Sequence, residues 1–278
     1  MEFTKMHGLG NDFILLNGFE RPPAADVTDL AIRLCDRRLG VGGDGLILVL
    51  PSLTAAALMR IINSDGSEAE MCGNGIRCFA KYVYDRGLVR TERFTVETLA
   101  GSVVPQLRIE AGRITGVRVD MGRPGLERSL IPMEGPDGPV IDEPLTAGGD
   151  TYRITSLLLG VPHTMVFVGD AAGVDRVRIG PLIERHPAFP RRTNVNFVEV
   201  VNDQEILVRT WERGAGATLA CGTGSCAAAV AAALTGRTGR RVTVHLEVGD
   251  LLVEWDASDT VYMTGPAVEV FTGQLTEG

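Results

Sequence analysis

The residues best suited to chemistry are two cysteines that occupy the same short motif at two places in the chain. The first copy reads Met71-Cys72-Gly73-Asn74-Gly75-Ile76-Arg77-Cys78, and the second reads Ala220-Cys221-Gly222-Thr223-Gly224-Ser225-Cys226. Each is followed by an apolar run of helical character that ends at a glycine. Because a cysteine at a helix start lies beside unpaired backbone N–H groups, we expect the pKa of Cys72 and of Cys221 to be lowered toward neutrality.

Two such thiols on opposite sides of one substrate would perform proton transfer at carbon. If related halves of the chain face each other, the two helix starts converge, and their N–H groups form a site for a substrate carboxylate. One cysteine, as the thiolate, would remove the proton next to that carboxylate. The other, as the thiol, would return a proton to the opposite face, while the N–H groups stabilise the developing charge. The predicted result is inversion at carbon without a cofactor.

Other interpretations of the cysteines stay open on the residues alone. Cysteines are often simply buried, which accounts for Cys35, Cys78 and Cys226 in or beside apolar runs. Intervals of five and four residues within the motifs do not match a Cys-x2-Cys zinc site. A Cys–His hydrolase using His163 would leave the second motif unexplained. A non-catalytic binding protein on the same scaffold is a further alternative, and His163 either tunes a cysteine's proton or is packed structurally.

The segments around the two motifs repeat in the same order. Asn63 and Glu212 each lie nine residues before a motif cysteine, at the end of an expected strand. Residues 94–97 after the first helix match residues 242–245 after the second, and residues 10–13 have a looser counterpart in 162–165. We interpret the repeat as an internal duplication. The shared spacing favours a role in a cleft for Glu212-Arg213 over an exposed ion pair.

Hydrophobic periodicity and turn residues predict the remaining elements. Strands are expected at residues 1–5, 13–17, 46–50, 57–62, 94–99, 166–168, 196–201, 206–210, 242–248, 251–255 and 268–271. Helices are expected at residues 29–39 and after each cysteine motif, as far as Gly87 and Gly236. Loops or breaks are expected at residues 5–12, 40–45, 63–66, 249–250 and 263–266. The segment 122–149, dense in glycine and proline, is interpreted as the crossing between two halves.

Composition excludes several classes of protein. The chain has 278 residues, of which 45% are hydrophobic and 22% charged, which suits two medium domains or one large one. A net charge of −8 and a pI near 5.1 argue against a nucleic-acid binder. The longest apolar stretch, 227–234, is about half of a bilayer span, and the N-terminus lacks a secretory pattern. We therefore expect a cytoplasmic protein whose five cysteines are reduced.

Further motifs extend the pattern along nearly the whole chain: Gly8-Leu9-Gly10-Asn11-Asp12-Phe13, Asn63-Ser64-Asp65-Gly66-Ser67 and Glu212-Arg213-Gly214-Ala215-Gly216. With the two cysteine motifs, and in this order, they closely resemble the diaminopimelate epimerase family. The resemblance implies an isomerase, independent of pyridoxal phosphate, that interconverts LL- and meso-diaminopimelate in lysine and peptidoglycan biosynthesis. A cofactor-independent racemase of another amino acid with the same cysteine pair is the alternative.

The resemblance also implies an architecture. It is a mixed α/β fold of two pseudo-symmetric domains, each a mixed β-sheet curled around a central helix, with the last strand returning to the first domain. We expect the first domain to span residues 1–118 and 266–278 with Cys72, and the second to span 119–265 with Cys221. A homodimer acting on a small amino-acid substrate is expected. No cofactor, metal ion, nucleic acid or membrane is expected as a partner.

Positions that match the family's motifs acquire expected roles. Cys72 and Cys221 are the expected catalytic acid/base pair, assisted by His163 and Glu212. The residues expected to bind the substrate are Asn11, Asn63, Gly73, Asn74, Asn194, Glu212, Arg213, Gly222 and Thr223. Arg213 suits a carboxylate and Glu212 an ammonium group. The positions that depart from the family's common pattern, and so bear on substrate preference, are Val161 (often asparagine), Ala217 (often glutamate) and Gly45 (often glutamine).

Overall fold

The computed structural model describes residues 1–19 and 26–275 and divides the chain into two compact units. Unit 1 comprises Met1–Asp120 and Thr264–Gly278, and unit 2 comprises Met121–Met263. The boundaries expected from the sequence, after residues 118 and 265, each lie two residues from these. No helix in the described part of the chain is long and apolar enough to cross a membrane.

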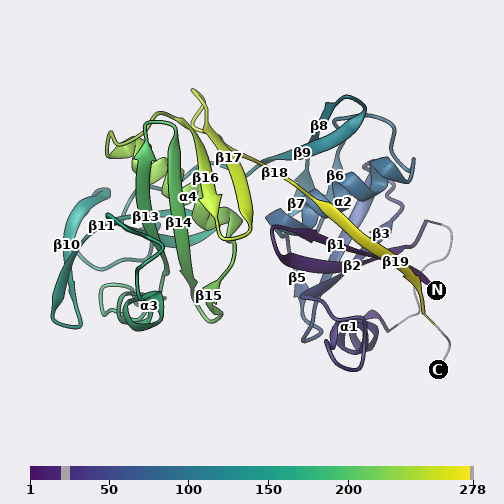
Figure 1. The fold of residues 1–278 in the computed structure, drawn as a ribbon, viewed down its shortest axis with the longest axis horizontal. Coiled ribbons are helices and arrows are strands. Elements are labelled where there is room, and N and C mark those ends of the chain that lie inside the picture. Colours follow the sequence, from purple (N-terminus) through teal and green to yellow (C-terminus); the bar gives the residue numbers. More distant parts are fainter. Residues whose placement is uncertain (20–25, 276–278) are drawn as a thin grey trace. The chain divides into compact units, whose positions relative to one another are not determined.

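Unit 1 is a mixed sheet with a helix on each face (Figure 1). The strands of this sheet are hydrogen-bonded in the order β19-β1-β2-β3-β4-β6-β7, and β5 pairs with β4. Strands β8 and β9 pair with each other outside this sheet. Alternate residues of β2, such as Ile14 and Leu16, pack with Ala31 and Leu34 of α1. The opposite face lies against α2, so the central strands are buried on both faces. The elements of this unit are β1 (Glu2–Gly8), β2 (Asn11–Asn17), α1 (Val27–Cys35), β3 (Gly45–Leu50), β4 (Ala57–Asn63), β5 (Glu68–Ala69), α2 (Gly73–Asp85), β6 (Val96–Thr98), β7 (Gly101–Val103), β8 (Gln106–Glu110), β9 (Arg113–Asp120) and β19 (Val268–Gln274).

Unit 2 has the same plan. Its strands run in the order β10-β11-β12-β13-β14-β16-β17, and β15 pairs with β14. Ile183 of α3 packs with Val195 and Phe197 of β13, while α4 lies against β11, β12, β13 and β17. The elements of this unit are β10 (Val140–Ala147), β11 (Asp150–Leu159), β12 (Val161–Phe167), α3 (Arg176–Glu184), β13 (Asn194–Asn202), β14 (Glu205–Glu212), β15 (Gly216–Thr218), α4 (Gly222–Leu234), β16 (Arg241–Leu246) and β17 (Gly249–Trp255). Strand β18 (Val261–Gly265) contains the boundary between the two units.

The strand pairings repeat step for step between the units. The pairs β2–β3 and β12–β13 are parallel, and so are β4–β6 and β14–β16. The pairs β3–β4, β6–β7, β13–β14 and β16–β17 are antiparallel. In each unit one helix separates the parallel strands and a second follows the short extra strand. The predicted fold of two related mixed sheets, each around a helix, is confirmed.

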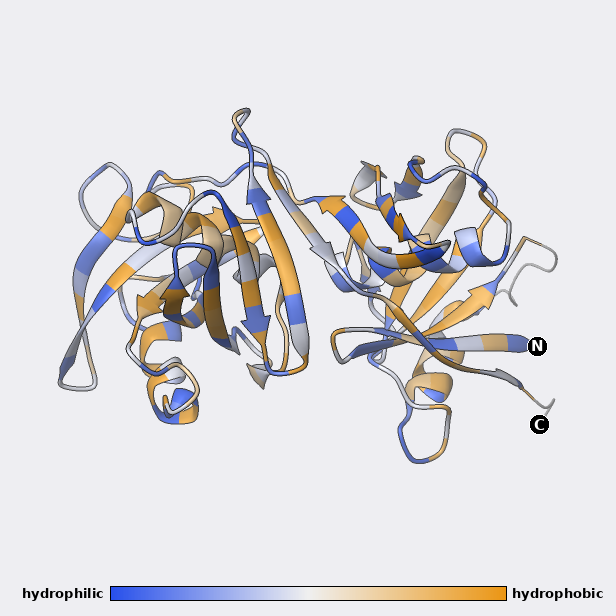
Figure 2. Ribbon diagram, turned by 45° about the horizontal axis from the view of Figure 1, so that its top comes forward, coloured by the Kyte–Doolittle hydropathy of each residue, from blue (hydrophilic) through white to orange (hydrophobic). Residues whose placement is uncertain are grey.

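The two central helices fill their sheets differently. Helix α2 buries large side chains, including Ile76, Phe79 and Val83, whereas α4 buries a run of alanines from 227 to 232 interrupted by Val230. Figure 2 shows bands of hydrophobic and hydrophilic residues along the strands of both units.

Several segments predicted as loops belong to strands. Residues 5–8 continue β1, and β2 begins at Asn11, so only Leu9 and Gly10 form the turn. Both have positive φ, 55° and 82°, which is typical of a tight hairpin turn. The turn predicted at 249–250 lies at 247–248, because Leu246 pairs with Gly249. The break predicted at 263–266 falls partly inside β18.

Other expectations about elements are wrong in extent. The helix predicted for 29–39 ends at Cys35, because the Asp36 carboxylate accepts the N–H groups of Arg38 and Leu39, both at 2.7 Å. Strand β11 and helix α3 were not predicted, and β12 begins at Val161 rather than at residue 166. The segment 122–149, interpreted as the crossing between halves, belongs to unit 2, as the expected domain bounds had it, and contains β10.

Candidate active site

Both motif cysteines are the N-cap residues of equivalent helices. Cys72 precedes α2 and Cys221 precedes α4, with similar extended backbone angles of −142°, 122° and −127°, 112°. The Cys72 sulfur accepts the N–H of Gly75 at 3.4 Å, and the Cys221 sulfur lies 3.5 Å from the Thr223 hydroxyl. In each unit a strand end and a short extra strand lead directly into the helix. The duplicated motif therefore places one thiol at the start of each central helix.

Burial changes the acidity expected of Cys221. Burial, together with the nearby Glu212 carboxylate, raises the pKa of its thiol to about 12. Hydrogen bonds from Thr223 and the Gly224 N–H act in the opposite direction but are outweighed. The expectation of a pKa lowered toward neutrality is thus wrong for Cys221 in this structure, because desolvation of the thiolate exceeds the effect of the helix start. Cys221 is a protonated thiol at neutral pH.

The remaining cysteines are buried and lie away from the helix starts. Burial raises the pKa of Cys78 to about 12 and that of Cys35 to about 11. Cys226 is fully buried in α4. Among the described residues, no three His, Cys, Asp or Glu side chains lie together in a way that could hold a metal ion.

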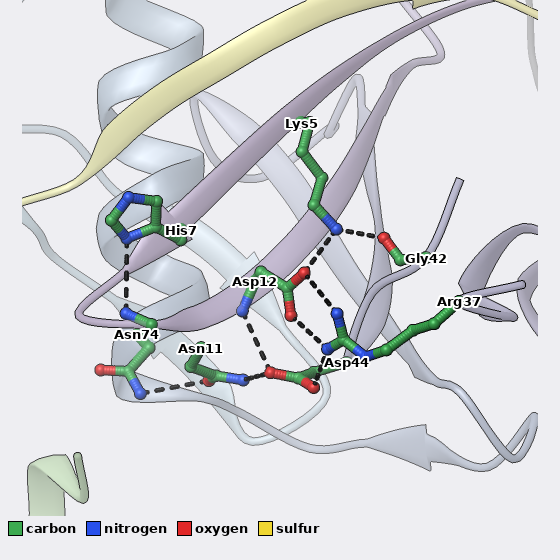
Figure 3. A network of polar contacts seen from close by, with 9 residues as sticks. Lys5, His7, Asn11, Asp12, Arg37, Gly42, Asp44 and Asn74 are labelled. Atoms are coloured by element: carbon green, nitrogen blue, oxygen red, sulfur yellow. Dashed lines mark hydrogen bonds and ion pairs between the residues drawn. The ribbon is translucent and has the colours of Figure 1, made fainter. Parts of the chain in front are cut away.

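Unit 1 brings Asn11, Cys72, Gly73 and Asn74 together. The Asn11 amide oxygen accepts the Asn74 amide N–H at 3.1 Å and lies 3.6 Å from the Cys72 sulfur, within reach of its S–H. The Asn11 amide nitrogen donates to Asp44 at 2.7 Å (Figure 3). The carbonyl of Gly73 accepts from Arg77 at 3.1 Å. Four expected site residues therefore form one connected cluster.

Asn63 is outside that cluster, at the end of β4, where the turn of residues 64–67 begins. Its side chain donates to the Ser67 hydroxyl at 2.9 Å. The turn is joined to the neighbouring loop by the Ser64 N–H, which donates to the Asp44 carbonyl at 3.2 Å. Asp44 therefore touches both the Asn11 cluster and the Asn63 turn.

Unit 2 brings the other expected residues to one end of its parallel strands. His163 of β12 is paired with Asn194 of β13, and the Asn194 amide oxygen accepts the Arg213 N–H at 2.7 Å. The carboxylate of Glu212 accepts the Thr218 hydroxyl at 2.6 Å. The Glu212 carboxylate raises the pKa of the Cys221 thiol at the start of α4, because a nearby negative charge disfavours the thiolate. Gly222 begins α4, and the Thr223 hydroxyl faces Cys221.

His163 is a buried, neutral imidazole. Burial, with a smaller effect of the Arg213 charge, lowers its pKa to about 3. Its Nδ1 lies 3.3 Å from the Asn196 amide nitrogen, whose amide oxygen accepts the Thr210 hydroxyl at 3.0 Å. An Asn196 N–H that donates to Nδ1 leaves the ring proton on Nε2. His163 can therefore donate a hydrogen bond from Nε2 without carrying a positive charge.

Comparison with known proteins finds one family along nearly the whole chain. The family model described as diaminopimelate epimerase matches residues 3–127 and 155–270. The chain is 60% identical to the diaminopimelate epimerase of Pelotomaculum thermopropionicum, covering 99% of this chain and 98% of that protein. It is also 60% identical to that of Moorella thermoacetica, covering 99% of each. The chain belongs to the diaminopimelate epimerase family. The family predicted from the motifs is confirmed.

Solved structures of other enzymes share the fold at low sequence identity. A phenazine biosynthesis protein of the PhzF family from Bacillus anthracis aligns with a TM-score of 0.70 at 16% identity, covering 100% of this chain and 99% of that one. A probable proline racemase from Agrobacterium radiobacter aligns with a TM-score of 0.67 at 18% identity, covering 99% and 92%. These similarities show the shared two-sheet fold of the diaminopimelate epimerase family and nothing about substrate.

The positions at which this member departs from the common family pattern have distinct surroundings. Val161 begins β12 and is half-buried, and Ala217 is exposed on β15. Gly45 begins β3, where an added Cβ would lie 3.0 Å from the Ile62 carbonyl of the adjacent strand. A glutamine at position 45 would therefore need a shift of that backbone.

Sequence reasoning missed two polar residues that contact expected site residues. Asp44 anchors Asn11, and Asn196 anchors His163. Asp44 lies in the segment 40–45, whose glycines were the only signal, and that signal indicated a loop. Asn196 was visible only as part of an expected strand.

Proposed function

We propose that this chain is a diaminopimelate epimerase that inverts one α-carbon by means of Cys72 and Cys221. The observation that carries the proposal is the duplication. Cys72 is the N-cap of α2 and Cys221 is the N-cap of α4, which are equivalent helices in two units with the same strand order. Relatives that are 60% identical over nearly their whole length and bear this name support the substrate. The proposal includes a cytoplasmic homodimer and requires no cofactor.

The proposed reaction is a proton exchange with two carriers. One cysteine, as the thiolate, takes the α-proton, and the electron pair of the broken C–H bond is delocalised into the substrate carboxylate. The thiol of the other cysteine gives its proton to the opposite face, so one C–H bond replaces another with inverted configuration. The two sulfurs exchange protonation states, and the reverse reaction uses them in opposite roles.

A base is required to generate the thiolate, because Cys221 is protonated in this structure. Glu212 is the candidate, since its carboxylate acts directly on the Cys221 thiol and could accept that proton when substrate binds. The neutral His163 would serve as a hydrogen-bond donor rather than as an acid. Backbone N–H groups at Gly73, Asn74, Gly222 and Thr223 would bind the reacting carboxylate. Asn11, Asn63, Asn194 and Arg213, with Glu212, would hold the remaining polar groups of the substrate.

The experiment is an exchange assay in deuterated water with the purified protein and LL-diaminopimelate, without pyridoxal phosphate. We expect deuterium at one α-carbon of the meso product, detected by mass spectrometry. Replacement of either motif cysteine, Cys72→Ala or Cys221→Ala, should abolish epimerisation. The matched controls Cys78→Ala and Cys226→Ala remove buried thiols from the same helices and should retain activity in whatever fraction of the protein folds.

The outcome separates the proposed substrate from the alternative one. Exchange with proline, hydroxyproline or histidine in the same assay, with none for diaminopimelate, would replace the substrate but keep the cysteine mechanism. Full activity of Cys72→Ala or Cys221→Ala would reject that mechanism.

A further inference from the structure

The side chain of Asn11 belongs to a line of hydrogen bonds that ends in a charged residue on each side. At one end Arg77 donates to the Asn74 amide oxygen at 2.8 Å, and the Asn74 nitrogen donates to the Asn11 oxygen at 3.1 Å. At the other end the Asn11 nitrogen donates to the Asp44 carboxylate at 2.7 Å. Figure 3 shows Asn11 lying between Asn74 and Asp44, with its amide spanning the gap.

The two ends fix the orientation of both amides. A guanidinium group only donates hydrogen bonds and a carboxylate only accepts them. Arg77 therefore requires the oxygen of Asn74 to face it, which leaves the Asn74 nitrogen for Asn11. Asp44 requires the nitrogen of Asn11 to face it, which leaves the Asn11 oxygen for Asn74 and Cys72. If either amide were turned over, donors would face donors and acceptors would face acceptors at both of that amide's hydrogen bonds.

Asp44 is itself held in place by a network of charges. One of its oxygens accepts from Arg37 at 2.7 Å, and the other also accepts the Asp12 backbone N–H at 3.1 Å. Arg37 is shared with the Asp12 carboxylate, which also pairs with Lys5 at 2.5 Å. Figure 3 shows the side chains of β1, β2 and the segment before β3 meeting at this point. The acceptor that orients Asn11 is thus fixed by three parts of unit 1.

The orientation of Asn11 affects the two protonation states of Cys72 differently. The Asn11 oxygen, 3.6 Å from the sulfur, can accept an S–H but presents negative charge density to a thiolate. The Gly75 N–H donates to the sulfur and so favours the thiolate. The charged or titratable groups around this end of α2 include Arg77 and Cys78 on the helix itself, His7 on β1, and Lys5, Arg37, Asp12 and Asp44 in the adjacent network.

We propose that Asp44 is a positioning residue that, through Asn11, stabilises the protonated thiol of Cys72. Cys72 is then the proton donor in the direction of reaction in which Cys221 is the base. Only this catalytic consequence rests on the proposed function; the effect of Asp44 on the thiol is a property of unit 1 alone.

The test is a titration of Cys72 in the full-length protein without substrate. The rate of alkylation by iodoacetamide is measured against pH, and modification of Cys72 is followed by peptide mass spectrometry. In Asp44→Ala the Asn11 amide is no longer held with its oxygen toward Cys72. The apparent pKa of Cys72 should therefore fall by about half a unit to one unit. The matched control Asp85→Ala removes a carboxylate from the far end of the same helix, where it pairs with Lys81 at 2.7 Å, and should leave the titration unchanged.

A double-mutant cycle separates positioning from simple removal of a negative charge. Asn11→Leu removes the acceptor without changing charge and should lower the apparent pKa by a similar amount. In the Asn11→Leu background, Asp44→Ala should add no more than about 0.2 unit, because its intermediary is already gone. An equal shift in both backgrounds, or none in either, would overturn the proposal. Asp44→Asn serves the same cycle if Asp44→Ala does not fold, as judged by circular dichroism.

Discussion

Gly224, in the first turn of α4, allows the helix to pass close to a buried polar group. A Cβ at this position would lie 2.5 Å from the Asn196 amide oxygen and 3.3 Å from the Cys221 sulfur. Asn196 cannot simply rotate away, because its oxygen accepts the Thr210 hydroxyl and its nitrogen faces His163. We therefore predict that Gly224→Ala forces the helix start or the Asn196 amide to move.

The change in the free energy of unfolding that we expect for Gly224→Ala is the sum of opposing contributions. Alanine in place of a helical glycine contributes up to about 1 kcal/mol of stability. Overpacking costs about 1–3 kcal/mol, and a lost hydrogen bond at Asn196 costs about 1 kcal/mol more. The expected net effect of Gly224→Ala is a loss of about 1–3 kcal/mol in the free energy of unfolding.

The equivalent glycine of the other unit provides the matched control. A Cβ at Gly75 would lie 3.2 Å and 3.4 Å from the Cδ1 atoms of Ile61 and Ile47 and 3.3 Å from the Cys72 Cβ. These contacts are tight, but a shift of a few tenths of an ångström relieves them, unlike the 2.5 Å contact at Gly224. Gly75→Ala should therefore change stability by less than about 1 kcal/mol, because helix propensity offsets the tight contacts. Guanidinium denaturation followed by circular dichroism gives both values. The reasoning is refuted if Gly224→Ala unfolds at the same denaturant concentration as wild type, or at a higher one.

Further predictions concern charge and packing. Burial opposes ionisation of Asp12, but contacts from Arg37 and Lys5 lower its pKa from 3.8 to about 2, so the carboxylate contributes about 2 kcal/mol above pH 4. That contribution is lost as pH falls toward 2. The difference in unfolding free energy between wild type and Asp12→Asn should therefore shrink between pH 4 and pH 2. A difference that stays constant over this range would contradict the prediction. The pKa of His163 near 3 predicts ring ¹⁵N shifts that stay constant from pH 8 to 5, whereas a titration midpoint near 6.5 would contradict its burial as a neutral ring. Phe79→Ala should cost about 3–5 kcal/mol by calorimetry or denaturant, since the ring is fully buried, while exposed Leu53→Ala should stay within about 0.5 kcal/mol.

The duplicated plan and its cysteines could be predicted because their signals are local. A cysteine followed by two glycines and an apolar run indicates a helix start wherever it occurs, and the interval from Asn63 to Cys72 recurs from Glu212 to Cys221. The structure places both Asn63 and Glu212 at strand ends, as expected. Relative position along the chain was therefore enough to locate the equivalent elements.

The remaining features depend on contacts between distant segments. Helix α3 was missed because it is short, contains Pro181 and has little apolar periodicity. Strand β11 was missed because its first half is polar and exposed while its second half is buried. The acidity of Cys221 depends on burial and on Glu212, neither of which a helix-start motif specifies. Asp44 acquires its role only where β1, β2 and the segment before β3 meet.

The return of β19 to unit 1 has a consequence for synthesis on the ribosome. Residues 121–263 form one continuous stretch, so unit 2 has its whole sequence available before the last strand is made. Strand β1 is made before unit 2, yet it pairs with β19, which follows unit 2, and the Leu275 N–H donates to the Met1 carbonyl at 2.7 Å. A nascent chain therefore carries one open edge of β1 until β19 has been made. Loss of the final strand by a premature stop codon would leave that edge free to pair with another chain, and aggregation would follow.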